Sequence, residues 1–360
     1  MAQRFPLQMQ HLPRGDKLKM RYVSLICAVC SLLSMPVLAD DSSATLQAGG
    51  LVLQKTDKIA LISEELYLSA KAVKVSYRFR NLTDADYTTT IAFPMPDVTG
   101  DPNFNIAIPA PANDNFMKFQ TLVDGQSVAS RIEQRAFRMA NGKPDVEITG
   151  RLEALHIPLV PTVDATEAAM ARLTDAQRRS LASAGIVESQ TFNDDKGRRV
   201  VQVPLWTLRS KFWRTQVFPK GKEIVVQQNY VPVVGSLDSL SIGSPYSGAS
   251  QDADYRKKYC TDEAFMGSAR QLYQSASKDG AKTFIAFEQY LGYVITSGGN
   301  WAGPIGDFRL IVDKGDPKTL VSFCGDGVKR TGATSFELER HNYMPQRDID
   351  ILFLRTAAAR

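Results

Sequence analysis

The residue types that most often do chemistry are sparse in this sequence of 360 residues. It contains only three histidines, and two of them, His156 and His341, lie beyond the first 39 residues. His156 stands between two apolar residues and His341 ends a polar stretch, so we expect each to be a hydrogen-bonded structural histidine. Beyond residue 39, no two cysteines have the spacing of a zinc site. The sequence therefore predicts no catalytic residue, no metal site and no cofactor.

Some short patterns resemble catalytic or metal-binding sequences. Ser275 and Lys278 match the Ser-x-x-Lys pattern of some acyl-transferring enzymes, but the companion Ser-Asp-Asn and Lys-Thr-Gly motifs are absent. The acids within residues 313–316 and 347–350 lie close together without the oxygen count of an EF-hand loop, which is typical of turns and solvated strand ends. A hydrolase stays an alternative, because two carboxylates that meet only in the folded chain leave no linear motif.

A glycine-rich stretch at residues 297–306, SGGNWAGPIG, is the most unusual segment. It lacks the Gly-Lys-Ser/Thr ending of a phosphate-binding loop, and no helix is expected after it. Trp301 is the candidate aromatic anchor of a ligand- or partner-binding loop, with Asn300 and Gly299 beside it. The alternative is a hairpin whose tryptophan folds back onto the core.

The elements that must position these residues are mainly β-strands. Between residues 73 and 80, apolar side chains alternate with Lys, Ser and Arg, a period of two that indicates a half-buried antiparallel strand. Residues 88–93 are β-branched and aromatic, and the turn residues before them predict a hairpin-like pair with residues 73–80. Asp124-Gly125 favours a tight hairpin turn between residues 116–123 and 127–132.

Helical signals interrupt this pattern. Residues 164–186 predict one or two short helices that end at Gly185, as an insertion into a sheet domain and a candidate lid or interaction surface. Residues 235–254 are rich in Ser, Gly and Asp and are expected to be a linker or long loop. Thr261 is expected to cap a helix that reaches about Ser277. The strands expected after this helix are residues 283–287, 292–296, 308–312, 319–324, 336–340 and 349–354.

Together these elements predict a mainly β fold. We expect an antiparallel β-sandwich within residues 40–234, with the helical insertion near 164–186, and a smaller α+β portion at residues 235–360. Trp206 and Trp213 fall where the strand pattern resumes, and core packing explains them better than a sugar or nucleotide surface does. The pattern does not decide whether the two portions share one core.

The first 39 residues are expected to be a signal peptide. They hold five of the 43 Lys and Arg residues and one of the 38 Asp and Glu residues, with an apolar stretch from Tyr22 to Val37. Cleavage is expected between Ala39 and Asp40, and Met20 is an alternative start. The rest of the chain keeps 38 basic against 37 acidic residues, which leaves no basic footprint for nucleic acid. We expect a periplasmic or secreted protein without a transmembrane segment after cleavage.

Export also bears on the cysteines. Cys27 and Cys30 would leave with the signal peptide, whereas Cys260 and Cys324 would remain. An even pair of cysteines in an exported chain predicts one disulfide, which would staple the second portion. Two unrelated buried thiols are the alternative.

Several segments of the chain resemble those of a known family. They are VKVSYRFRN at 73–81, IAFPMP at 91–96, FPKG at 218–221 and GNWAGPIGDFRL at 299–310. In this combination, the chain resembles an uncharacterised family of secreted proteobacterial proteins, the domain-of-unknown-function family 4424. The resemblance implies export and the cysteine pair, and no catalytic residues. The first half also resembles the vault and inter-alpha-trypsin type of β-sandwich, whose domains are generally interaction modules.

The leading functional hypothesis is a non-enzymatic periplasmic envelope protein that acts through protein–protein contacts. It rests on the β architecture and on the scarcity of histidines and metal-ligand clusters. The first alternative is a protein that binds an envelope saccharide or small ligand through Trp301 and neighbouring tyrosines, and the second is a hydrolase with an unrecognised site. The partner and the oligomeric state do not follow from the sequence.

Overall fold

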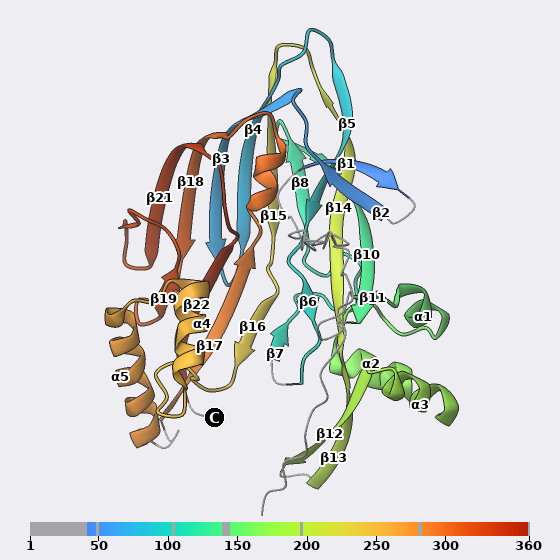
Figure 1. Ribbon diagram of the computed structural model, residues 1–360, viewed down its shortest axis with the longest axis vertical. Helices are drawn as coiled ribbons and strands as arrows, with labels where there is room; N and C mark the ends of the chain where they lie inside the picture. The colour runs from blue at the N-terminus through green and yellow to red at the C-terminus, as the bar shows by residue number, and fades with distance from the viewer. Residues whose placement is uncertain are drawn as a thin grey trace, which may run out of the picture. The chain divides into compact units, whose positions relative to one another are not determined.

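The sheets of this protein are built from strands that lie far apart in the sequence. The computed structural model describes residues 42–47, 50–102, 105–138, 145–194, 197–279 and 283–358 (Figure 1). All of them belong to the compact unit Val37–Arg360. The expected signal peptide and its cleavage site lie outside the described residues. Within these ranges, no helix is long and apolar enough to cross a membrane.

Two large sheets face each other across the main core. Sheet A consists of β1 (Ser42–Gln47), β2 (Gly50–Gln54), β5 (Tyr87–Pro94), β6 (Val98–Thr99), β10 (Arg131–Arg138), β11 (Val146–Glu147) and β14 (Trp206–Phe218). Sheet B consists of β3 (Ile59–Ser69), β4 (Val73–Asn81), β8 (Gln120–Val123), β9 (Gln126–Val128), β15 (Glu223–Tyr230), β18 (Ile305–Asp313), β20 (Lys329–Arg330) and β21 (Ser335–Tyr343). Sheet A has the order β11-β10-β14-β5-β1-β2 with β6 on β14, and sheet B has the order β20-β21-β18-β3-β4-β15-β8-β9. Their described pairings are antiparallel, except that β3 and β18 run parallel.

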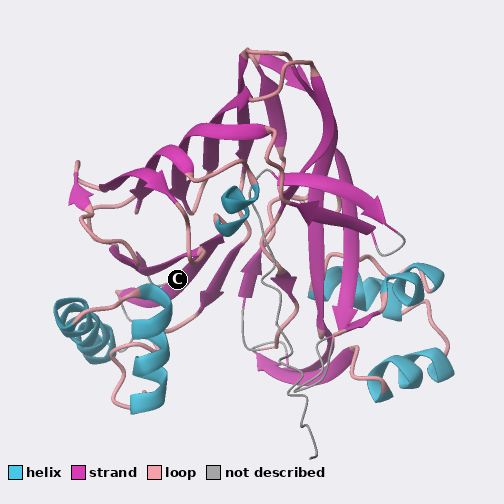
Figure 2. Cartoon of the chain, turned by 45° about the horizontal axis from the view of Figure 1, so that its top comes forward, coloured by secondary structure: helices cyan, strands magenta, loops and turns pink. Residues whose placement is uncertain are grey.

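A third sheet, a two-stranded ribbon and two groups of helices complete the fold (Figure 2). Sheet C has the order β19 (Leu320–Phe323), β22 (Ile349–Ala358), β17 (Phe284–Tyr293), β16 (Val234–Leu237) and β7 (Asn105–Ala107), and the ribbon pairs β12 (Val187–Asp194) with β13 (Gly197–Pro204). One helical group is α1 (Thr149–Ala154), α2 (Val163–Met170) and α3 (Asp175–Ser183). The other is α4 (Ala249–Tyr259) and α5 (Glu263–Asp279), and η1 (Thr296–Asn300) is a 3₁₀ turn.

The main hydrophobic core lies between sheets A and B and continues into sheet C. Phe79 of β4 packs edge-on against Phe218 of β14, with ring centroids 5.9 Å apart. Phe93 of β5 packs against Tyr230 of β15 at the same separation of 5.9 Å, and Tyr293 of β17 belongs to the same core. Aromatic side chains from facing sheets thus fill the interior in the tilted and edge-to-face arrangements that rings prefer. The mainly β, sandwich-like fold expected from the sequence is confirmed.

Residues on both sides of the expected boundary at 234/235 share this core. β18 pairs with β3 over residues 63–69, and β16 pairs with β7 on one side and β17 on the other. A strand from the end of the chain is therefore a central strand of sheet B. The expected boundary does not divide the core into two.

Two expectations about single turns and strands are confirmed. Val73, Val75, Tyr77 and Phe79 are buried in β4 while their charged neighbours are exposed. Asp124 and Gly125 have φ angles of 47° and 80°, as a two-residue turn between β8 and β9 requires.

The expected hairpin between residues 73–80 and 88–93 is wrong. β4 pairs with β3 and β15 in sheet B, whereas β5 pairs with β1 and β14 in sheet A. The turn at residues 82–86 therefore carries the chain from one layer to the other. Alternation identifies which face of a strand is buried, but it does not identify the partner strand.

The linker or long loop expected at residues 235–254 is present in part, because residues 238–248 form a loop without helix or strand. Part of it extends β16, and α4 begins at Ala249. Gly243, with φ 75°, lies so close to α5 that a Cβ atom would be 2.6 Å from the backbone of Ala269. The loop is thus packed on α5 at Gly243, where the absence of a side chain permits the close approach.

The predicted disulfide is confirmed between Cys260, just after α4, and Cys324, just after β19. Its sequence separation of 64 residues predicts that its loss lowers the free energy of unfolding by about 4 kcal/mol on the chain-entropy model. We expect the paired Cys260→Ser, Cys324→Ser variant to show this loss in urea titrations. Reductant should destabilise the wild type by a similar amount and leave the variant unchanged. Equal midpoints for wild type and variant would contradict the prediction.

Candidate functional site

A groove of about 990 Å³ lies between β10 of sheet A, β7 of sheet C and the helical insertion. This volume is at the upper end of the range for small-ligand pockets. The groove is lined by Gly100, Asp101, Asn105, Ile106, Ile108, residues 111–114, Ile132, Gln134, Glu153, residues 158–165, Val203 and Pro204.

Trp206 anchors two walls of the groove. Its fully buried indole donates from Nε1 to the carbonyl oxygen of Leu159 at 2.7 Å. Its own carbonyl oxygen accepts the N–H of Gly100 at 2.9 Å. A Cβ atom at position 100 would lie 2.4 Å from the carbonyl oxygen of Pro204, so only glycine fits there. One core tryptophan therefore fixes the spacing between walls that are remote in sequence.

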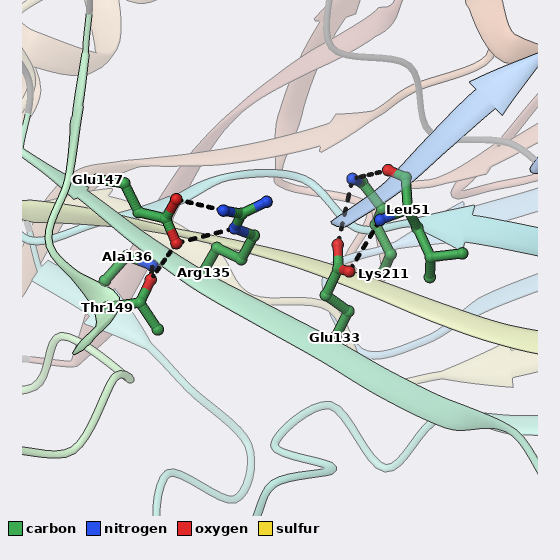
Figure 3. A network of polar contacts seen from close by, with 7 residues as sticks. All are labelled: Leu51, Glu133, Arg135, Ala136, Glu147, Thr149 and Lys211. Atoms are coloured by element: carbon green, nitrogen blue, oxygen red, sulfur yellow. Dashed lines mark hydrogen bonds and ion pairs between the residues drawn. The ribbon is translucent and has the colours of Figure 1, made fainter. Parts of the chain in front are cut away.

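The floor strand β10 is held from its opposite face by a network of polar contacts (Figure 3). Ile132 and Gln134 point to the groove, and the alternate residue Glu133 points away from it, as the pleat of a strand requires. Glu133 accepts the N–H of Leu51 at 2.9 Å and is 3.4 Å from Nζ of Lys211, which donates to the Leu51 carbonyl at 2.6 Å. These contacts tie β10 to β2 and β14.

A second part of the network ties β10 to β11 and α1 (Figure 3). The guanidinium of Arg135 donates to both carboxylate oxygens of Glu147, one of them from Nε at 2.9 Å. Thr149 Oγ1 donates to Glu147 at 3.0 Å and accepts the N–H of Ala136 at 2.9 Å. The start of the insertion is thus fixed against the floor of the groove.

The Arg135→Gln variant is expected to raise the pKa of Glu147. Hydrogen bonds from Arg135 hold that pKa below the ordinary glutamate value. A lowered pKa in the folded state adds stability above the ordinary value, and this contribution is lost as the pH falls through the lowered pKa. The contribution from this pair should therefore disappear on acidification. Carboxyl-detected NMR titration measures the pKa directly.

The matched control for this titration is Arg131→Gln on the same face of β10. Arg131 packs over the ring of Trp213, with its guanidinium carbon 5.1 Å from the ring centroid. We expect this control to leave the titration of Glu147 unchanged. If Arg135→Gln also left it unchanged, the pairing seen in the structure would not govern the carboxylate.

The groove is acidic at its rim and apolar along its walls. Asp114, Glu153 and Asp164 are exposed, and Asp101 is half-buried. Among the described residues that line the groove there is no Lys, Arg or His, and none is aromatic. Its apolar side chains are Ile106, Ile108, Ile132, Leu159, Val160, Val163 and Val203, with four prolines. This lining suits a ligand that carries both cationic and apolar groups.

A second polar centre holds α4 against sheet C. Glu288 of β17 is fully buried, and its Oε1 accepts the N–H groups of Ser241 at 2.5 Å and Ile242 at 2.8 Å. Its Oε2 accepts the hydroxyl groups of Tyr255, at 2.6 Å, and Tyr290. Burial, followed by the charge of Glu288, raises the pKa of both tyrosines above the ordinary value. The four donors on this carboxylate thus hold α4 and the loop at residues 241–242 against β17.

The residues of the predicted binding loop lie elsewhere, and none lines the groove. Trp301 is 3% exposed, and its ring centroid is 4.7 Å from that of Phe79 and 6.3 Å from that of Phe218. Asn300 is 6% exposed, and its carbonyl accepts the N–H of Thr56 at 2.8 Å. A Cβ atom on Gly299 would meet the Met344 sulfur at 3.2 Å. Core packing thus accounts for this loop, and its role in ligand binding stays a prediction.

The remaining candidates are spread over the surface. His156 is exposed, with φ 52°, just after α1. Exposed His341 lies 2.7 Å from Asp307. Ser275 donates to the carbonyl of Gln271 within α5 at 2.9 Å. In the described parts of the chain, no group of three or more His, Cys, Asp or Glu residues is placed to hold a metal ion.

Comparison with known proteins identifies the family. Residues 39–352 match the model of a family described as a domain of unknown function (DUF4424). The chain belongs to this family. The DUF4424 region includes every groove segment and both cysteines of the disulfide. No curated protein matches the sequence.

One solved structure similar to this DUF4424 protein is described as a "putative nutrient binding protein" from Legionella pneumophila. The two sequences are 13% identical, and the match covers 87% of this chain and 72% of the other. The TM-score is 0.41.

Sequence reasoning missed the groove of this DUF4424 protein. Its acids come from four separate segments and share no motif. The available signals were Pro158 and Pro161, which flank a short apolar run, and the insertion, which was expected to be a lid or interaction surface. α1 was also missed, because six residues with one buried side chain, Leu152, show no periodicity.

Proposed function

We propose that this protein is a non-enzymatic binding protein that holds an extended segment of a partner protein in the groove. The observation that carries this proposal is the charge of the lining, which has four acids and no basic residue among its described members. Complementary charges set the specificity and the rate of association. The segment would present basic side chains to the acidic rim and apolar side chains to the walls.

The rigid walls support binding rather than catalysis. Trp206 fixes the wall at Leu159 and the wall at Gly100, and the network around Glu133 and Arg135 fixes the floor. A preformed site lowers the cost of ordering on association. The described lining contains no histidine, cysteine or lysine that could act together with these acids in catalysis.

An envelope saccharide is the alternative occupant. It fits this groove less well, because sugar faces commonly stack on aromatic rings and none of the described lining residues is aromatic. Titration with cell-wall fragments, monitored by tryptophan fluorescence, tests whether a saccharide binds and so separates this alternative from the peptide.

The proposal also includes export. A signal peptide cleaved near Ala39-Asp40 would deliver the chain to the periplasm or the outside, where the Cys260–Cys324 disulfide forms and persists. N-terminal sequencing of the protein recovered from the envelope tests the cleavage site.

Binding is tested with an acetylated hexapeptide of alternating lysine and valine, by fluorescence anisotropy at low and high salt. We expect saturable binding that weakens with salt. The triple variant Asp114→Asn, Glu153→Gln, Asp164→Asn should weaken binding roughly ten-fold, since exposed charge pairs contribute about 0.2–1 kcal/mol each.

The matched control makes the same change in net charge at exposed acids outside the groove, as Asp84→Asn, Asp254→Asn, Glu339→Gln. It should bind as the wild type does. Equal weakening in both triple variants would show attraction to net charge alone and would overturn the assignment of the groove.

A further inference from the structure

The strand β7 ends sheet C inside the groove. Sheet C ends with the pair β16-β7, and β7 pairs with β16 through Asn105–Ser236, Ile106–Gly235 and Ala107–Val234. Among the described strands, β16 is its one partner. Asn105 and Ile106 are both groove residues. The free edge of a strand presents backbone N–H and C=O groups that can pair with another chain.

The side chains of β7 leave this edge accessible. Asn105 and Ala107 are exposed, and Ile106 between them is half-buried and packs on the main core. The side chain of Asn105 donates from Nδ2 to Asp238 at 2.7 Å, beyond the end of β16. Ile106 therefore faces the main core, and the side chain of Asn105 is held on the side of β16.

The wall opposite β7 is unsuited to backbone pairing. It includes Pro158 and Pro161, which have no N–H group to donate. The carbonyl of Leu159 is already taken by Trp206, and that of Val160 accepts the N–H of Thr162 at 2.9 Å. A chain in the groove would find apolar contacts on this side and backbone partners on the side of β7.

We infer that the partner segment binds as an added strand on the edge of β7. This inference rests on the proposed function and specifies the bound conformation. Alternate residues of the segment point to opposite faces, so a pattern of alternating basic and apolar residues matches a rim of acids and a floor built by Ile106 and Ile132. Addition of a strand to an open edge is a general mode of peptide recognition, in which main-chain hydrogen bonds supply affinity.

Backbone methylation of the hexapeptide tests the inference. Two versions of the peptide carry three N-methyl groups each. One version is methylated on the backbone nitrogens of the lysines, and the other on the backbone nitrogens of the valines. In a strand, the N–H groups of alternate residues point to opposite edges, so only one set faces β7. We expect one version to bind at least about ten-fold more weakly, because each backbone hydrogen bond contributes roughly 0.5–1.5 kcal/mol. The other version should bind within about two-fold of the unmethylated peptide.

The outcomes separate the two proposals. If the unmethylated peptide binds and both methylated versions bind equally well, strand addition is overturned while the groove remains a peptide site. If the unmethylated peptide does not bind, the proposed function fails first. Amide hydrogen exchange gives a second readout on the protein itself. Protection should increase at Asn105–Ala107 and not at Gln126–Val128, a strand of the same length at the edge of sheet B.

Discussion

The Trp206→Ala variant should lose about 3–5 kcal/mol of unfolding free energy, the range found when a large buried aromatic is truncated. Trp206 packs within the core of the insertion, beside Leu152, Met170 and Leu181. Its removal also leaves the carbonyl of Leu159 without its donor. Urea titrations measure the loss, and peptide binding should weaken with it because the groove wall at Leu159 loses its side-chain anchor.

Two further variants separate packing from the hydrogen bond. Trp206→Phe keeps most of the apolar volume and removes the N–H, so we expect a smaller loss of stability together with weaker binding. Trp213→Ala, on the outer face of the same strand and only partly buried, should cost less and leave binding intact. Full binding by a stably folded Trp206→Phe would show that the wall at Leu159 needs no anchor.

The Glu288→Ala variant is expected to destabilise the protein by at least about 3 kcal/mol. The substitution removes the Glu288 acceptor of two backbone N–H groups and two tyrosine hydroxyls, and a buried unsatisfied donor costs about 1–3 kcal/mol. The loss should centre on α4 and the loop at residues 241–242. Hydrogen exchange of these amides, with urea titration of the whole protein, measures both effects.

Glu288→Gln and Glu339→Ala complete this experiment. The glutamine keeps the volume and one oxygen acceptor, so its cost should lie between those of wild type and alanine. Glu339 is an exposed strand residue, and its replacement should stay within about 0.5 kcal/mol. If Glu288→Ala left the free energy of unfolding unchanged, water would replace the carboxylate without cost.

The sequence predicts strands far better than it predicts their partners. The alternation at Val73–Phe79 identified β4 and its buried face, and Asp124-Gly125 identified a turn. Each signal is local, because the pleat and the φ angles act over a few residues. The pairing of β18 with β3 depends on segments at opposite ends of the chain, and both have buried faces that match many strands equally well.

The polar sites were harder to predict for a related reason. Glu288 has no flanking motif, and its donors come from a loop, a helix and its own strand. α4 buries only Tyr255 and Tyr259, so its sequence shows no apolar stripe. The cysteines were predictable because their chemistry restricts them to few roles. For Trp301 the sequence left both a binding anchor and a core position open, and the residue occupies the core position.

The parallel pairing of β3 with β18 has a consequence for folding during synthesis. Glu65 of β3 and Arg309 of β18 form an ion pair across 244 residues of sequence, so sheet B stays open until nearly the whole chain has emerged. Contacts of such long range form slowly, since the loop between them must close first. Until then, the bare edge of β3 is a template for aggregation. A chain of this topology therefore exposes the edge of β3 until β18 has been made.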